Sequence, residues 1–179
     1  MFHITQRLLL RPAWPEDADA LFGGIADQGV VRNLARAPWP YLPEHAREFV
    51  MRKQDARFPR FLITKPGPHG SELVGCIGID ENDGEVEIGY WIARPFWGQG
   101  FATEAARGVL EVARLLGHRQ IVAGHFTDNP ASGKVLRKLG FIPTGKTALR
   151  HSCGRGEKAE CVMYRLDLDA EAGPNLVAA

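Results

Sequence analysis

The chain has 179 residues, of which 45% are hydrophobic, so it is long enough to bury the core of one compact domain. Its 22 basic and 21 acidic residues are interspersed and give a net charge of +1, which argues against a nucleic-acid-binding surface or a basic membrane-binding segment. No apolar run is long enough to span a membrane, and the N-terminus lacks a signal-peptide pattern, so we expect a cytoplasmic protein.

The cysteines and the chain ends add further expectations. Cys76, Cys153 and Cys161 contain no C-x-x-C pair, which predicts free thiols rather than a disulfide framework or a structural zinc site. The histidines show no metal-ligand spacing, so we expect no metal. One domain is predicted over residues 1–169, as a monomer or homodimer, and the small, aperiodic segment 170–179 is predicted to be a flexible tail.

The first half of the chain predicts a strand, two helices and three strands. The stretch "ITQRLLLRP" is typical of a strand, "PEDADALFGGIAD" of a helix, and residues 44–56 of a second helix. The strands "RFLITK" and "ELVGCIGI" follow, and the turn "ENDG" leads into "EVEIGYWI". Alternation in this last strand puts two sets of side chains on opposite faces, Val86, Ile88, Tyr90 and Ile92 against Glu85, Glu87, Gly89 and Trp91.

The second half predicts two helices and three strands. A helix follows Gly100, with an apolar stripe at Ala102, Ala106, Val109, Ala113 and Leu116. The strand "QIVAGHF" precedes the helix "DNPASGKVLRKLGF", in which Asn129 is the expected N-cap and Gly140 lies just past the end. Strands from residue 141 and from about residue 159 to residue 168 complete an antiparallel hairpin around "HSCGRGEK". The whole pattern predicts a mixed α/β fold.

The junction "FWGQGFATEA" predicts a phosphate site. A strand that turns through Gly98 and Gly100 into a helix leaves unpaired N–H groups at the positive end of the helix dipole. Phosphate fits there without a basic side chain; Ala102 keeps the mouth narrow and the Thr103 hydroxyl adds a donor. An ordinary glycine turn is the alternative, whereas a dinucleotide-binding motif is disfavoured because its sixth position is Thr103 rather than glycine.

Three stretches resemble one known family. The segments "EIGYWIARPFWGQGFATEA", "DNPASGKVLRKLGF" and "TQRLLLRP", together with the element order, resemble the GCN5-related N-acetyltransferases (GNAT), and within them the ribosomal-protein alanine acetyltransferases. The resemblance spans nearly the whole chain. It implies a three-layer α/β fold with a mostly antiparallel, twisted sheet of six to seven strands and about four helices. The sheet would splay between the strand ending at Ile92 and the strand ending near Phe126.

The resemblance implies acetyl-CoA as cosubstrate, bound in the V-shaped gap. Its pyrophosphate would lie on the amides of residues 97–103, its pantetheine arm would run past Ile92, and a free N–H near that residue would polarise the thioester oxygen. Trp97 stands where the family usually has Arg or Gln. The cofactor-binding residues implied are Ile92, Ala93, Trp97, Gly98, Gln99, Gly100, Phe101, Ala102, Thr103, Asn129 and Ser132.

The resemblance also implies catalytic roles. Many members carry a tyrosine that can protonate the leaving thiolate where this chain has Leu136, and in the branch it resembles Ser132 would do so. The attacking ammonium must lose a proton, and Glu87 is our candidate base, directly or through a water. An ion-paired surface carboxylate is the alternative interpretation of that residue. His125 and His151 are alternative proton relays, although a lone histidine is more often structural, and a covalent route through Cys153 lacks a partnered base.

Two segments should select the acceptor, "LARAPWPYLPEHA" at residues 34–46 and "TALRHSCGRGEK" at residues 147–158. In them Trp39 and Tyr41 suggest an aromatic wall or loop anchors, and His151 should lie near the acceptor entrance. The acceptor is open among a peptide N-terminus, a small amine and an aminoglycoside-like molecule. The sequence favours an acetyl-CoA-dependent N-acetyltransferase, with an acyl-CoA-sensing module or another phosphate-ligand protein, such as a nucleotide binder, as alternatives.

Overall fold

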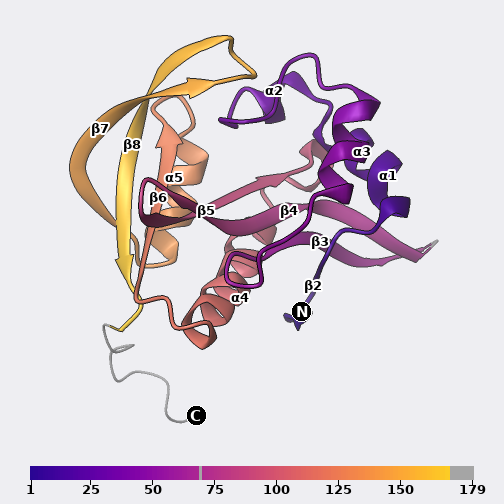
Figure 1. Ribbon diagram of the computed structural model, residues 1–179, viewed down its shortest axis with the longest axis horizontal. Coiled ribbons are helices and arrows are strands. Elements are labelled where there is room, and N and C mark those ends of the chain that lie inside the picture. The colour runs from indigo at the N-terminus through magenta and orange to yellow at the C-terminus, as the bar shows by residue number, and fades with distance from the viewer. Residues whose placement is uncertain (69, 170–179) are drawn as a thin grey trace.

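The computed structural model describes residues 1–68 and 70–169, which fold around one eight-stranded sheet of order β1-β2-β3-β4-β5-β6-β8-β7 (Figure 1). The tail predicted at residues 170–179 lies outside the described residues. The strands are β1 (His3–Ile4), β2 (Leu9–Arg11), β3 (Arg60–Gly67), β4 (Gly70–Asn82), β5 (Glu85–Ile92), β6 (Gln120–Phe126), β7 (Ile142–Ser152) and β8 (Glu157–Asp167). The α-helices are α1 (Ala18–Ile25), α2 (Gln28–Val31), α3 (Pro43–Met51), α4 (Phe101–Leu115) and α5 (Pro130–Lys138).

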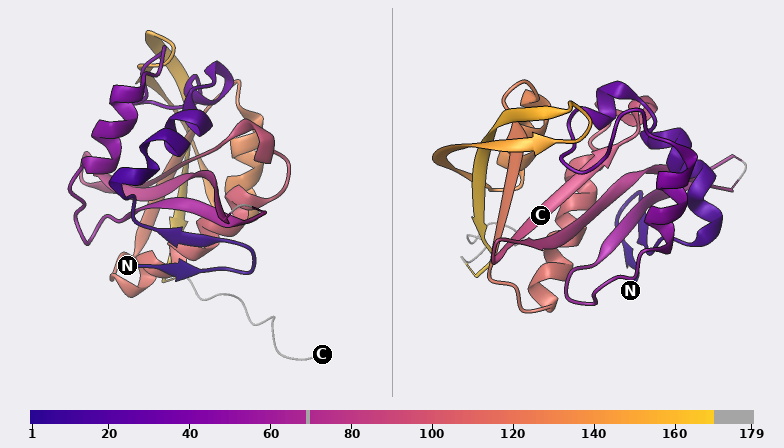
Figure 2. Two further views of the ribbon diagram at one scale, coloured as in Figure 1. Left: turned by 90° about the vertical axis from the view of Figure 1, so that its right-hand side faces the viewer. Right: turned by 45° about the horizontal axis from the view of Figure 1, so that its top comes forward.

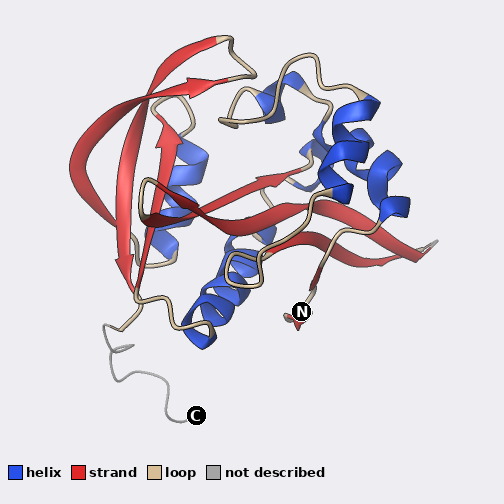
Figure 3. Cartoon of the chain, in the orientation of Figure 1, coloured by secondary structure: helices blue, strands red, loops and turns tan. Residues whose placement is uncertain are grey.

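The sheet separates two hydrophobic cores, which makes three layers (Figures 2 and 3). One core packs α4 and α5 against the strands and includes Ile88 and Ile92. The other packs α1, α2 and α3 against the opposite face and includes Trp91 and Ala93. The alternation predicted for β5 is therefore confirmed, because successive side chains of this strand enter different cores.

The sheet has eight strands, where six to seven were expected. The additional strand arises at the N-terminus, because the single strand predicted there is a short antiparallel hairpin of β1 and β2. The turn is closed by the Thr5 amide, which donates to the Leu8 carbonyl oxygen at 2.9 Å, and by the Leu8 amide, which donates to Thr5 Oγ1 at 3.1 Å. The mixed α/β class and the mostly antiparallel pairing are confirmed.

The helices follow the predicted pattern with shifted ends. Helix α3 stops at Met51 rather than residue 56, because Arg52 takes an extended backbone with φ −63° and ψ 125°. The short helix α2, which was not predicted, begins after Asp27, whose Oδ1 accepts from the Gly29 amide at 2.7 Å. The apolar stripe of α4 is wider than predicted, because Phe101 is also buried. Ala102, which was predicted to be in the stripe, is only partly buried.

The cysteines are free thiols, with Cys76 and Cys161 buried and Cys153 exposed. Burial raises the pKa of the Cys76 thiol to about 12, so this residue is an inert core group rather than a nucleophile. Within residues 1–68 and 70–169, no helix has the length and apolarity needed to cross a membrane.

Candidate active site

The sheet opens between β5 and β6, the one parallel pair among the strands that the structure describes. These strands are in register at a single pair, Glu87 with Val122, and diverge beyond it towards their C-terminal ends (Figure 1). A cavity of about 720 Å³ lies in this opening, walled by the diverging strand ends, the start of α5, the segment after α2 and part of α3. The divergence confirms the splay between the strands ending at Ile92 and Phe126. Open α/β sheets bind ligands in such places because the strand ends leave a crevice.

The turn before α4 has the conformation that the glycines predicted. Gly98 and Gly100 have φ values of 74° and 80°, in the left-handed region that favours glycine. Gly100 is the N-cap of α4 and no side chain caps the helix, so its first amides are available to a ligand. Trp97 Nε1 donates to the Ile92 carbonyl oxygen at 2.6 Å, which fixes the turn against the end of β5.

A basic side chain that sequence reasoning did not assign to the site lies at this turn. Both Nη atoms of Arg7 donate to the Gln99 carbonyl oxygen at 3.2 Å, and its guanidinium carbon lies 4.5 Å from the centre of the Phe101 ring. Arg7 Nε also donates to Glu104 at 2.7 Å. The arrangement brings a fixed cation beside the free amides, where the sequence predicted backbone donors and the Thr103 hydroxyl without a basic side chain.

Glu104 holds this arginine in place. One of its carboxylate oxygens accepts from Thr5 Oγ1 at 2.6 Å and from the Arg7 amide at 2.7 Å. Burial alone would raise the pKa of Glu104, but the hydrogen bonds from Thr5 and Arg7 outweigh it and the pKa lies below its usual value. The β1–β2 turn is therefore tied to the first turn of α4 by an ionised carboxylate.

The start of α5 forms one wall of the cavity. Asn129 caps the helix, with its Oδ1 accepting from the Ser132 amide at 3.4 Å and its Nδ2 donating to Ser132 Oγ at 3.1 Å. Both residues line the cavity, and so does Leu136 one turn further on. The predicted N-cap is confirmed, and it orients the Ser132 side chain.

Glu87 lies in the cavity wall on β5 and is ion-paired with Arg150 of β7. Its second carboxylate oxygen accepts from Asn82 Nδ2 at 3.3 Å, and the side chain is 18% exposed. The ion pair of the alternative interpretation is therefore present, and the carboxylate also borders the cavity; its role as the base stays a prediction.

The remaining predicted residues divide between the cavity and its surroundings. Tyr41 and His151 line the cavity, whereas the wall, within the described chain, does not include Trp39, whose side chain is 41% exposed. His125 also lines the cavity, with Nδ1 2.8 Å from the Phe126 carbonyl oxygen. The Ala93 amide donates to the Val74 carbonyl oxygen at 2.8 Å, so this N–H is not the free donor expected near Ile92.

The two acceptor segments touch each other and close the cavity from above. Ser152 Oγ donates to the Leu34 carbonyl oxygen at 2.8 Å, and the Cys153 amide donates to the Ala35 carbonyl oxygen at 2.9 Å. Figure 1 shows the tip of the β7–β8 hairpin over the segment that follows α2. Sequence patterns gave no sign of this contact, which joins residues more than one hundred positions apart.

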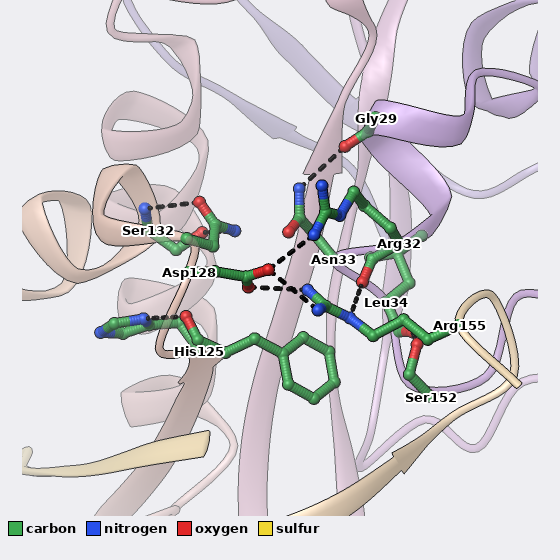
Figure 4. Close-up of polar contacts among 11 residues, drawn as sticks. Gly29, Arg32, Asn33, Leu34, His125, Asp128, Ser132, Ser152 and Arg155 are labelled. Carbon is green, nitrogen blue, oxygen red and sulfur yellow. Dashed lines mark hydrogen bonds and ion pairs between the residues drawn. The ribbon is translucent and has the colours of Figure 1, made fainter. Parts of the chain in front are cut away.

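Two arginines strengthen the closure by sharing one carboxylate. Arg32 donates to Asp128 at 2.6 Å, and both Nη atoms of Arg155 donate to Asp128 at 2.8 and 2.9 Å (Figure 4). The Arg155 hydrogen bond is the main reason that the pKa of Asp128 lies below its usual value. The cluster joins α2, the β6–α5 loop and the hairpin tip around the cavity.

The part of the chain that the structure describes contains no group of three or more His, Cys, Asp or Glu side chains that could hold a metal ion.

Comparisons with known proteins agree with this geometry. The family described as "Acetyltransferase (GNAT) domain" matches residues 7–142. An uncharacterized N-acetyltransferase, YoaA of Bacillus subtilis, is 32% identical over 148 residues, covering 79% of this chain and 82% of its own. The ribosomal-protein-serine acetyltransferase of Escherichia coli is 32% identical over 100 residues, covering 54% of each chain.

A solved structure supports the same fold. The RimL ribosomal L7/L12 alpha-N-protein acetyltransferase in complex with coenzyme A superposes with a TM-score of 0.78 at 22% identity, covering 96% of this chain and 100% of that one.

Proposed function

The chain belongs to the GNAT acetyltransferase family, and from that premise we propose that it transfers the acetyl group of acetyl-CoA to a primary amine by direct attack in a ternary complex. The acceptor is a peptide N-terminus or a small-molecule amine. One observation carries the proposal: Glu87 and Ser132 line the same cavity between β5 and β6, and the chain leaves β5 through the Gly98–Gly100 turn into α4, whose start no side chain caps. We also propose that residues 1–169 form the single catalytic domain.

The cofactor would be held mainly by main-chain donors. Its pyrophosphate would accept from the amides at residues 98–103, which the positive φ values of Gly98 and Gly100 leave accessible. The Trp97 amide, also expected there, instead donates to the Arg94 carbonyl oxygen at 3.2 Å. Arg7 adds a positive charge at this point, fixed by Glu104 and by the Gln99 carbonyl oxygen. The acyl end would then extend past Ile92 into the cavity, towards Ser132.

The reaction needs a proton acceptor and a stabilised leaving group. The amine loses a proton before it attacks the thioester carbon, and we propose that Glu87 accepts it directly or through a water. The C–S bond then breaks with its electron pair on sulfur, the attacking nitrogen releases its second proton to water, and Ser132 donates a hydrogen bond to the sulfur. Arg150 and Asn82 keep the Glu87 carboxylate at the cavity wall during this exchange.

The acceptor would enter under the closure formed by the two loop segments. Tyr41 and His151 line this part of the cavity, together with charged side chains of both signs. A relative acts on a ribosomal protein by its name, so we include peptide N-termini among the acceptors to be tested. The mixed charge also accommodates small amines, which belong in the same test.

The experiment begins with ligand binding and then tests turnover. Thermal shifts with CoA, acetyl-CoA, ATP and NAD identify the ligand class, since a ligand at 100 times its dissociation constant stabilises by about 2.7 kcal/mol. Thioester consumption is then followed with a panel of peptides and amines. Stabilisation by CoA and acetyl-CoA with amine-dependent consumption supports the proposal. Stabilisation by ATP or NAD alone contradicts it.

A non-catalytic acyl-CoA-sensing module is the second candidate. It is favoured by Leu136, which lines the cavity and has no proton to donate. Acetyl-CoA binding without consumption across the whole panel would select this candidate.

A further inference from the structure

One hydroxyl group beside the cavity has no hydrogen-bond partner. Tyr90 lies on β5, lines the cavity and packs against the core shared with α4 and α5. Within residues 1–68 and 70–169, its Oη is the only buried side-chain nitrogen or oxygen atom that lacks a partner. Buried polar groups are nearly always satisfied, because an unmade hydrogen bond in the interior costs stability. This exception therefore calls for a functional explanation.

Ser132 lines the same cavity as Tyr90, and its side chain is close enough to lower the pKa of the Tyr90 phenol against the effect of burial. The Ser132 amide donates to Asn129 Oδ1, which fixes the orientation of the Asn129 amide and directs its Nδ2 towards Ser132 Oγ. The hydroxyl oxygen of a serine has two lone pairs, and Asn129 occupies only one of them. Ser132 Oγ thus retains one free lone pair and its own hydrogen.

We propose that Tyr90 is a positioning residue for Ser132: its hydroxyl donates to the free lone pair of Ser132 Oγ when coenzyme A occupies the cavity. With both lone pairs occupied, the Ser132 hydrogen points into the cavity towards the cofactor sulfur. This inference rests on the proposed function, because it concerns the sulfur that leaves during acetyl transfer.

Tyr90 acts through Ser132, and not on the sulfur directly, because its phenol oxygen is buried. In this scheme the phenol reaches the ligand through the Ser132 hydroxyl. Burial also raises the pKa of the Tyr90 phenol, with the Ser132 side chain opposing the shift, so Tyr90 stays protonated and serves as a neutral donor. No proton leaves Tyr90 in this scheme. The electron pair of the C–S bond goes to sulfur, and the two protons that the nitrogen loses go to Glu87 and to water.

Other nearby groups are less suited to this task. His125 lines the cavity, but Nδ1 is held by the Phe126 carbonyl oxygen and Nε2 lies 3.4 Å from the Tyr164 hydroxyl. Leu136 has no donor. Tyr90 and Asn129 are therefore the residues whose side chains orient Ser132.

The test measures the acidity of the coenzyme A thiol in the binary complex, which needs no amine acceptor. The ultraviolet absorbance of the thiolate is titrated against pH for the wild type, Tyr90→Phe, Ser132→Ala and the double variant. We expect Tyr90→Phe and Ser132→Ala each to lower the acid dissociation constant of the bound thiol by about 3- to 10-fold, the worth of one neutral hydrogen bond. The double variant should equal Ser132→Ala, because Tyr90 acts through Ser132.

A matched control is Tyr164→Phe on β8. Tyr164 is a buried tyrosine whose hydroxyl, unlike that of Tyr90, has a partner: it accepts from Arg137 Nη1 at 3.0 Å. This variant should lose thermal stability and leave the thiol titration unchanged. Tyr90→Phe should instead keep its thermal stability and change the thiol titration, because the Tyr90 hydroxyl has no hydrogen-bond partner in the free protein.

Several results would overturn the inference. One is a thiol titration in Tyr90→Phe that matches the wild type. Another is a change of the titration by Tyr90→Phe that is as large in the Ser132→Ala protein as in the wild type. The third is loss of coenzyme A binding in Tyr90→Phe. Failure of the wild type to bind coenzyme A would instead refute the proposed function, so the two failures are distinguishable.

Discussion

The variant Gly100→Ala should weaken cofactor binding in addition to its effect on the stability of the fold. Gly100 has a φ of 80°, and a Cβ built there meets only Arg7 Nη2, at 3.6 Å. An L-residue in this conformation costs about 1–2 kcal/mol, which corresponds to a fall in melting temperature of about 2–8 °C for a chain of this size. In Gly100→Ala the methyl would also stand in front of the amides that we assign to the pyrophosphate.

The other end of the same helix supplies the control. Gly117 has a φ of 84° and nothing lies within 4 Å of a Cβ built on it, so Gly117→Ala imposes the same backbone strain away from the proposed site. Both variants should lose similar thermal stability. Only Gly100→Ala should bind coenzyme A more weakly in isothermal calorimetry, by roughly 10- to 100-fold, the worth of one or more hydrogen bonds to a charged group. Equal affinities for the two variants would refute the assignment of the α4 start to the cofactor.

Three further predictions concern side chains. Glu87→Gln should reduce turnover most at neutral pH and recover in part at high pH, where more of the amine is unprotonated; a defect of constant size across the pH range would argue against a base. Ser132→Ala should lower kcat by about 10-fold with little change in coenzyme A affinity, and a parallel loss of both would make it a binding contact only. Glu104→Gln should lower the melting temperature at neutral pH. Because the pKa of Glu104 is lowered on folding, its stabilisation is complete above its unfolded pKa of about 4.3 and disappears as the pH falls through the folded value, so the two melting temperatures should converge in acid, and a constant gap would contradict this reasoning.

Features set by neighbouring residues could be predicted from the sequence. The alternation around Tyr90 and Trp91 gave the two faces of β5, and Asn129 gave the start of α5, because side-chain direction and capping depend on a few adjacent positions. The positive φ angles of Gly98 and Gly100 followed from the same local logic.

Long-range pairs could not be predicted in this way. Arg7 meets Gln99, Arg150 meets Glu87 and Arg155 meets Asp128 only because the sheet and loops bring distant segments together. No periodicity or spacing encodes which surface arginine pairs with which carboxylate. The sequence pattern placed Tyr90 on an apolar face of β5 and no more. Whether its hydroxyl finds a hydrogen-bond partner depends on how β5 packs against α5, which no local pattern encodes.

A crystal structure with bound coenzyme A tests the central claim most directly. We predict the diphosphate within hydrogen-bond distance of the amides at residues 98–103 and beside Arg7, and the sulfur in the cavity next to Ser132. Coenzyme A bound elsewhere, with the start of α4 covered by protein or solvent alone, would contradict the account.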